Sequence, residues 1–110
     1  LHYNMNMIST LKEIPLVILC GGKSSRMGED KSLLPFSRYS TLTQYQYERL
    51  KKEFPNIYLS SKVNKFDFLE NDNTIIYDKS DIYSPLVALQ TIFNFILRGN
   101  FQSIFYHVII

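Results

Sequence analysis

The sequence predicts an α/β fold in which helices cover both faces of a mostly parallel sheet, giving three layers. Short apolar runs bounded by turn residues alternate with longer segments whose apolar residues recur every three or four positions. The first pattern indicates buried strands and the second indicates amphipathic helices, and their alternation is typical of parallel sheets with helical crossovers. At 110 residues, 45% of them apolar, the chain suffices for one domain with its own core and is too short for two.

The first strand is predicted at 16–19, where the run Leu-Val-Ile-Leu is followed by Gly21 and Gly22. A short continuous apolar run is typical of a strand that is buried on both faces of a parallel sheet. Residues 1–7 are interpreted as a ragged N-terminal extension, because Met5 and Met7 follow closely on Leu1 and no signal-peptide pattern is present. Residues 8–110 are assigned to a single domain.

The first helix is predicted to begin at a cap formed by Ser40 or Thr41 and to run through Glu53, because Pro55 cannot continue it. The apolar residues spaced to share its buried face are Leu42, Tyr45, Leu50 and Phe54. Strands are then predicted at 56–61 and 74–77, which are rich in β-branched and aromatic residues. The polar stretch between them is expected to contain a helical turn at 66–70.

The second helix is predicted to begin after a Ser84 cap, with Pro85 in its first turn, and to end at Gly99. The apolar residues spaced to share its buried face are Leu86, Leu89, Phe93, Ile96 and Leu97. A last buried strand is predicted at 104–110. In sheets of this kind ligands bind beyond the carboxyl ends of the strands, so the loop after the first strand is the first place to look for chemistry.

Charge and cysteine content narrow the functional classes. The 12 basic and 10 acidic residues form no block of one sign, which argues against nucleic-acid and membrane-surface binding. The apolar runs are about a third of the ~20 residues needed to span a bilayer, so we expect no membrane association. The single cysteine, Cys20, cannot form an internal disulfide, which favours a reducing, cytoplasmic location.

The loop at 19–31 combines glycines, hydroxyls and cations directly after the first strand. Gly21 and Gly22 can let backbone N–H groups approach a phosphate, although two glycines alone would equally suit a tight turn. Arg26 and Lys31 can neutralise the oxygens that gain charge during phosphoryl transfer, which makes them the candidate catalytic residues. The glycine spacing matches neither the Walker pattern nor the dinucleotide fingerprint, which argues against a P-loop ATPase and a dehydrogenase.

The pattern Leu-x-Gly-Gly-x-Ser-x-Arg-Met-Gly-x-Asp-Lys in this loop resembles the signature of nucleotidyltransferases, especially the molybdenum cofactor guanylyltransferases. The resemblance implies a Rossmann-like fold of the nucleotide-diphospho-sugar transferase type. It also implies that the loop wraps the phosphates of GTP. The residues to which it assigns nucleotide contacts are Leu19, Cys20, Gly21, Gly22 and Lys31.

Further positions resemble the family downstream of the loop. Ser60 stands where relatives commonly place an asparagine that contacts the nucleotide, and Asp78 matches an aspartate near the nucleotide. An ordinary turn residue is an equally good interpretation of Asp78. Ser84 and Ala88 replace the glycines of the family's Gly-Pro-Leu-Ala-Gly stretch, which would alter the approach of the backbone to guanine.

The resemblance implies transfer of GMP from GTP to molybdopterin or Mo-molybdopterin with release of pyrophosphate. It also implies molybdenum-insertion and molybdoenzyme maturation proteins as partners. In the family, an aspartate just after the strand at 104–110 holds Mg²⁺, whereas this sequence stops at Ile110. No metal ligand is therefore assigned within the chain, which looks truncated at its C-terminus, and little turnover is expected from it alone. The alternatives are a related sugar- or alditol-phosphate nucleotidyltransferase and a non-catalytic nucleotide-binding remnant.

Overall fold

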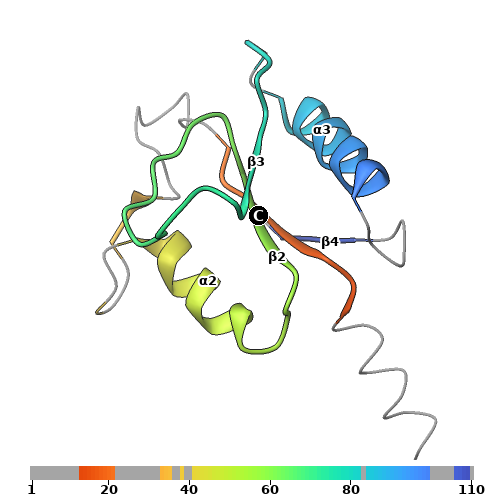
Figure 1. Cartoon of the computed structure of the whole chain (residues 1–110). Coiled ribbons are helices and arrows are strands. Elements are labelled where there is room, and N and C mark those ends of the chain that lie inside the picture. The colour runs from red at the N-terminus through yellow and green to blue at the C-terminus, as the bar shows by residue number, and fades with distance from the viewer. Residues whose placement is uncertain are drawn as a thin grey trace, which may run out of the picture.

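The sheet contains four parallel strands in the order β3-β2-β1-β4 (Figure 1). The computed structural model describes residues 13–21, 33–35, 38, 41–82, 84–99 and 106–109. The strands are β1 (Leu16–Leu19), β2 (Ile57–Ser61), β3 (Ile75–Tyr77) and β4 (His107–Ile109), and the helices are α2 (Leu42–Lys51) and α3 (Pro85–Arg98). The predicted α/β class is confirmed, and a strand lies at each of the four predicted places.

Strand β1 lies between β2 and β4, with Leu16 opposite both Ile57 and His107. Its side chains alternate between two cores, because successive residues of a strand point to opposite faces of the sheet. Leu16 and Ile18 belong to one buried cluster and Val17 to the other. The prediction of a strand buried on both faces is therefore correct for β1.

The helices cover opposite faces of the sheet (Figure 1). Tyr47 of α2 belongs to the cluster of Leu16 and Ile18, whereas Ile92 and Ile96 of α3 pack in the cluster of Val17. The result is the predicted three-layer arrangement. In the described part of the chain, neither helix has the length and apolar character needed to cross a membrane.

Helix α2 begins as predicted and ends earlier than predicted. The Thr41 hydroxyl caps it by accepting a hydrogen bond from the Gln44 amide at 3.1 Å. The helix ends at Lys51 rather than Glu53, since the amide of Glu53 already turns back to the Leu50 carbonyl at 3.0 Å.

The predicted buried face of α2 is confirmed only in part, because Leu50 and Phe54 pack against the core cluster but are not its fully buried residues. Thr43 and Tyr47 are the buried residues of this helix, while Leu42 and Tyr45 are only half-buried. Thr43 is short enough to lie directly under the sheet, with its Oγ1 atom 4.0 Å from Cys20 Sγ. Apolar residues occur around much of this helix, so spacing alone did not identify the side that faces the sheet.

Helix α3 has the predicted boundaries, and its predicted buried face is confirmed only at Ile96 and Leu89, which pack in the cluster under the helix. The Ser84 hydroxyl accepts a hydrogen bond from the Leu86 amide at 3.2 Å, Pro85 lies in the first turn, and Gly99 forms the C-cap. The fully buried residues are Ile92 and Ile96. Three residues of the predicted face are exposed instead, namely Leu86, Phe93 and Leu97.

Two further expectations also need correction. The chain turns at Asp67 and Phe68 without forming the helical turn expected at 66–70. Strand β4 is half-buried rather than buried, because β1 pairs with one of its edges and no described strand with the other. The ring of the half-buried His107 lies edge-on to Phe54 at a centroid distance of 5.7 Å.

Candidate functional site

The carboxyl ends of β1, β2 and β3 meet at one edge of the sheet. Leu19 lies opposite Ser60, and Ser61 lies opposite Tyr77. The backbone hydrogen bonds between the strands continue one residue past the ends of β1 and β3. The Cys20 amide donates to the Ser60 carbonyl at 2.9 Å, and the Asp78 amide donates to the Ser61 carbonyl at 3.0 Å. This edge is where parallel α/β sheets bind ligands.

The structure brings together five of the residues predicted to contact a nucleotide, which are Leu19, Cys20, Gly21, Ser60 and Asp78. The other candidate residues of the loop lie outside the described residues, namely Gly22, Arg26 and Lys31. The structure thus describes the base of the predicted phosphate loop and its neighbours on β2 and β3.

At the end of β1, the backbone rather than the side chains faces the edge. The Cys20 side chain is buried, and its thiol donates to the Ile18 carbonyl at 3.5 Å, as expected for a packed cysteine. Leu19 packs against the cluster under α3. Gly21 is exposed, and a Cβ atom added there would meet nothing within 4 Å. Among the described residues, none crowds the Cβ position of Gly21.

Ser60 is 2% exposed, so its hydroxyl is withdrawn from the open edge. Its carbonyl is engaged by the Cys20 amide. A shorter side chain replaces the family's asparagine at a buried position, and the base would have to be recognised by other groups.

Asp78 is held by a set of contacts that sequence reasoning did not find. Its Oδ2 atom lies 3.2 Å from Lys62 Nζ, and its Oδ1 atom accepts a hydrogen bond from the Ser80 amide at 3.0 Å. Lys62 also donates to the Ser80 carbonyl. Asp78 forms both the expected turn and a charge pair that ties the end of β2 to the segment after β3. The sequence held one signal for this pair, because Lys62 directly follows β2 and Asp78 directly follows β3, and these two strands are neighbours.

Lys65 is the second residue that sequence reasoning missed. Its Nζ atom donates to the Cys20 carbonyl at 3.0 Å and to the Gly21 carbonyl at 3.5 Å. A lysine of the segment after β2 therefore contacts the first residues of the predicted phosphate loop. No local sequence pattern predicts this contact, because 45 residues separate Lys65 from Cys20.

Two tyrosines near the sheet have altered acidity. Loss of water contact raises the pKa of Tyr77, and the hydrogen bond that its hydroxyl donates to Asp72 Oδ2 at 3.1 Å raises it further. Burial raises the pKa of Tyr58, whose ring packs edge-on against Phe95 under α3. Both phenols therefore stay protonated at neutral pH and supply no anionic base to the site.

The described residues contain no group of three or more His, Cys, Asp or Glu side chains that could hold a metal ion. Asp78 already receives the Lys62 ammonium and the Ser80 amide. These residues do not fit a magnesium site, and the predicted metal aspartate beyond Ile110 lies outside the chain.

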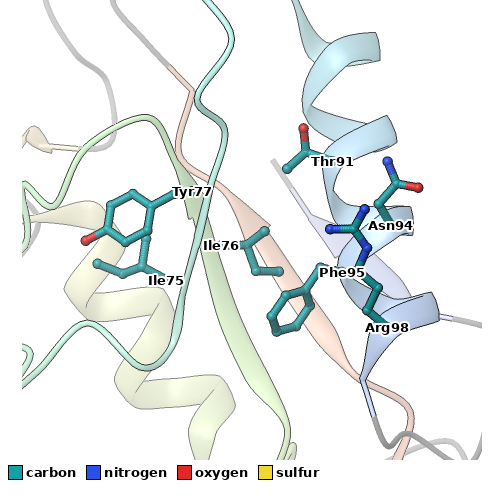
Figure 2. A pocket seen from close by; sticks show the side chains of 7 residues that line it. All are labelled: Ile75, Ile76, Tyr77, Thr91, Asn94, Phe95 and Arg98. Atoms are coloured by element: carbon teal, nitrogen blue, oxygen red, sulfur yellow. The ribbon is translucent and has the colours of Figure 1, made fainter.

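A separate hollow of about 320 Å³ lies beside β3, on the side covered by α3 (Figure 2). Its apolar lining includes Ile76 of β3 and Phe95 of α3, and Thr91, Asn94 and Arg98 border it from the helix. The Tyr77 ring points to the other side of the strand (Figure 2). None of the predicted nucleotide-binding residues lines this hollow, so it is distinct from the strand-end site.

Comparison with known proteins matches most of the chain, including the 19–31 loop, to a known family. Residues 16–104 match the MobA-like NTP transferase domain. A molybdenum cofactor guanylyltransferase of Campylobacter jejuni subsp. jejuni serotype O:6 is 45% identical over 101 residues, covering 90% of this chain and 48% of the relative. A protein of the same name from Helicobacter pylori strain G27 is 36% identical over 88 residues, covering 76% of this chain and 42% of the relative.

The chain thus spans about half the length of the curated relatives that it matches. No solved structure was found to match it. The family match covers β1, β2 and β3, both helices and the whole 19–31 loop, and it ends before β4. Because this is most of the 110 residues, the chain belongs to the MobA-like NTP transferase domain family.

Proposed function

We propose that this chain is the nucleotide-binding portion, at residues 8–110, of a molybdenum cofactor guanylyltransferase. The enzyme would transfer GMP from GTP to molybdopterin, or to Mo-molybdopterin, and release pyrophosphate. The names of the relatives, at 45% and 36% identity, support this choice within the family. The chain covers 48% of the first relative, so the remainder of the site would come from the part of the enzyme that this chain does not match.

The observation that carries the proposal is the shared edge at the ends of β1, β2 and β3. There Cys20, the residue before Gly21, and Asp78 each donate a backbone hydrogen bond to the end of β2, at the Ser60 and Ser61 carbonyls. The strand order also changes direction at β1, because β2 and β3 lie on one side and β4 on the other. Nucleotides bind in the crevice outside such a switch point.

The proposed roles follow from the chemistry of each group. Backbone amides of the loop, beginning at Gly21, would donate to the triphosphate, and Arg26 and Lys31 would neutralise the charge that develops on it. A phosphate oxygen of molybdopterin attacks the α-phosphorus of GTP, which forms one P–O bond and breaks the bond to the leaving pyrophosphate. The protein's part is chiefly to position the reactants and stabilise charge.

Cofactor, partners and location belong to the same proposal. Mg²⁺ would neutralise charge on the triphosphate, and we assign it no ligand among the described residues. Proteins that insert molybdenum and mature molybdoenzymes would exchange the substrate and product. The buried free thiol of Cys20 supports action in the reducing cytoplasm.

The test is nucleotide binding by the protein taken to the end of its reading frame. GTP, CTP, UTP and ATP are titrated calorimetrically with Mg²⁺ into the wild type and into Lys31→Ala. We expect GTP to bind most tightly and Lys31→Ala to weaken it by about tenfold or more, since a charge-assisted contact to phosphate is lost. A pyrophosphate-release assay with molybdopterin as acceptor then tests the transfer itself.

Two other outcomes would replace the proposal. Preference for CTP or UTP would indicate an enzyme that activates a sugar phosphate or an alditol phosphate with the same kind of loop. Binding of no nucleotide would leave a non-catalytic remnant of the family as the better explanation.

A further inference from the structure

Lys65 comes from a segment that is fixed to the core on both sides. Its neighbour Phe66 is 4% exposed within the cluster under α2, and the Phe66 amide donates to Asn64 Oδ1 at 3.2 Å. Earlier in the segment, the Ser61 hydroxyl donates to the Val63 carbonyl at 2.8 Å. The Lys65 ammonium lies 5.8 Å from the centre of the Phe66 ring, within range of a cation–π contact. The side chain therefore starts from a well-defined backbone position.

From this position the ammonium reaches the carbonyl oxygens of Cys20 at 3.0 Å and of Gly21 at 3.5 Å. The Cys20 carbonyl points towards β2, as its amide does when it donates to Ser60. Strand β2 ends at Ser61, so Lys65 supplies a charged donor where the regular pairing of β1 and β2 finishes. Hydrogen bonds from a charged donor are stronger than those between neutral groups.

This contact fixes the orientation of the peptide that joins Cys20 to Gly21. In a planar trans peptide, the carbonyl of one residue and the amide of the next point in opposite directions. With the Cys20 carbonyl held towards β2, the Gly21 amide points to the β4 side of β1. That is the side of the switch in strand order, and the space around Gly21 is open.

We propose that Lys65 is a positioning residue for nucleotide binding, which holds the Cys20–Gly21 peptide so that the Gly21 amide faces the triphosphate. The inference rests on the proposed function, because it requires that this amide be a phosphate donor. Lys65 acts through the peptide from the β2 side, and the phosphate binds on the opposite side. Lys65 should therefore strengthen the binding of the triphosphate rather than the binding of the base.

The experiment compares wild type, Lys65→Met, Lys65→Arg and Lys79→Met in the protein taken to the end of its reading frame. Methionine keeps the apolar stem without the donor, and arginine restores a charged donor. Lys79 is an exposed lysine next to Asp78 at the same edge, so Lys79→Met removes an equal charge without touching the loop. Calorimetry gives the affinities for GTP and GMP, and thermal unfolding reports on the fold.

We expect Lys65→Met to weaken GTP binding by about tenfold and GMP binding by about threefold or less, because one preorganised donor to the outer phosphates is lost. Arginine should restore most of the affinity, and Lys79→Met should change it less than about threefold. In the transfer assay the KM for GTP should rise while the KM for molybdopterin stays unchanged. Lys65→Gln replaces the methionine variant if that variant does not fold.

Equal losses for GTP and GMP, or a loss from Lys79→Met as large as that from Lys65→Met, would overturn the positioning role. So would wild-type GTP affinity in Lys65→Met, although the proposed function would then stand. Failure of the wild type to bind GTP would instead overturn the proposed function, and this inference with it.

Discussion

At the scale of single residues, Lys62 and Asp78 carry opposite charges largely withdrawn from water, with side-chain exposures of 18% and 6%. Removing one partner leaves the other charge buried with incomplete solvation, which costs more than the pair itself contributes. We expect Lys62→Met to lower the free energy of unfolding by about 2–4 kcal/mol, somewhat less than for a fully buried pair. Urea unfolding without nucleotide measures this change.

Two further variants distinguish the stability contributed by the Lys62–Asp78 pair from the effect of simply removing a lysine charge. The double variant Lys62→Met/Asp78→Asn should recover part of the loss, because no unpaired charge remains and the Ser80 amide keeps an acceptor. Lys79→Met, at an exposed neighbouring position, should change stability by less than about 0.5 kcal/mol. Strictly additive losses in the double variant would show that the two side chains are not energetically coupled.

A substitution at Gly21 should affect ligand binding more than it affects the stability of the fold. Its φ is not in the left-handed region, and an added Cβ would meet no protein atom within 4 Å. We therefore expect Gly21→Ala to shift the free energy of unfolding by less than about 1 kcal/mol. If a phosphate approaches this backbone closely, the methyl group should cost about 1–3 kcal/mol of GTP binding, which is about 5- to 150-fold in affinity.

The two measurements on Gly21→Ala are chemical unfolding and GTP calorimetry, with Gly99→Ala as the matched control. Gly99 is exposed at the end of α3, with an extended backbone that alanine can adopt. The control should leave GTP affinity unchanged. Unchanged GTP affinity in Gly21→Ala would place the phosphates elsewhere.

Sequence patterns identified the residues at the strand ends but not the lysines that organise them. Cys20, Ser60 and Asp78 could be placed because each follows or ends a short apolar run. Lys65 could not, since its partner Cys20 lies 45 residues away and comes close only through the pairing of the strands. The Lys62–Asp78 pair left only a weak signal, in that each residue directly follows one of two neighbouring strands. Such contacts depend on tertiary structure and leave no periodic trace in the sequence.

At the scale of elements, α3 presents two apolar stripes, and only one faces the sheet. Ile92 is 0% exposed, whereas Leu86 is 76% exposed. The capping residues fix where a helix starts and ends, but they do not fix its rotation about its axis. The sequence therefore predicted the boundaries of α3 correctly and its buried face only in part, because Leu89 and Ile96 face the core and Leu86, Phe93 and Leu97 do not.

The rotation of α3 predicts opposite outcomes for two truncations of similar size. We expect Ile92→Ala to cost about 2–5 kcal/mol of unfolding free energy, because it empties space between α3 and the sheet. Leu86→Ala should cost less than about 0.5 kcal/mol, because its side chain is already in water. Chemical unfolding of both variants decides the point, and a larger loss at Leu86 would restore the face predicted from spacing.

At the scale of the whole molecule, the order β3-β2-β1-β4 sets the place of the candidate site. The sequence predicts parallel strands, but the strand order depends on which side of β1 each crossover packs. That choice is made by the clusters under α2 and α3, which are formed from residues far apart in the chain. The order puts Gly21 beside the switch, with Lys65 and Asp78 on the β2 side.

This arrangement predicts where GTP will slow amide hydrogen exchange. Bound nucleotide should slow exchange at Gly21 and Asp78, and also at 62–66, because Lys65 ties that segment to the loop and ligand binding suppresses local opening. The amino ends of the strands, at Asn56 and 73–74, should exchange at unchanged rates and serve as the internal control. Mass spectrometry of the protein taken to the end of its reading frame, with and without GTP, gives both rates in one experiment. Protection centred instead on 91–98 would move the nucleotide to the hollow between β3 and α3, where Arg98 would be the available cation.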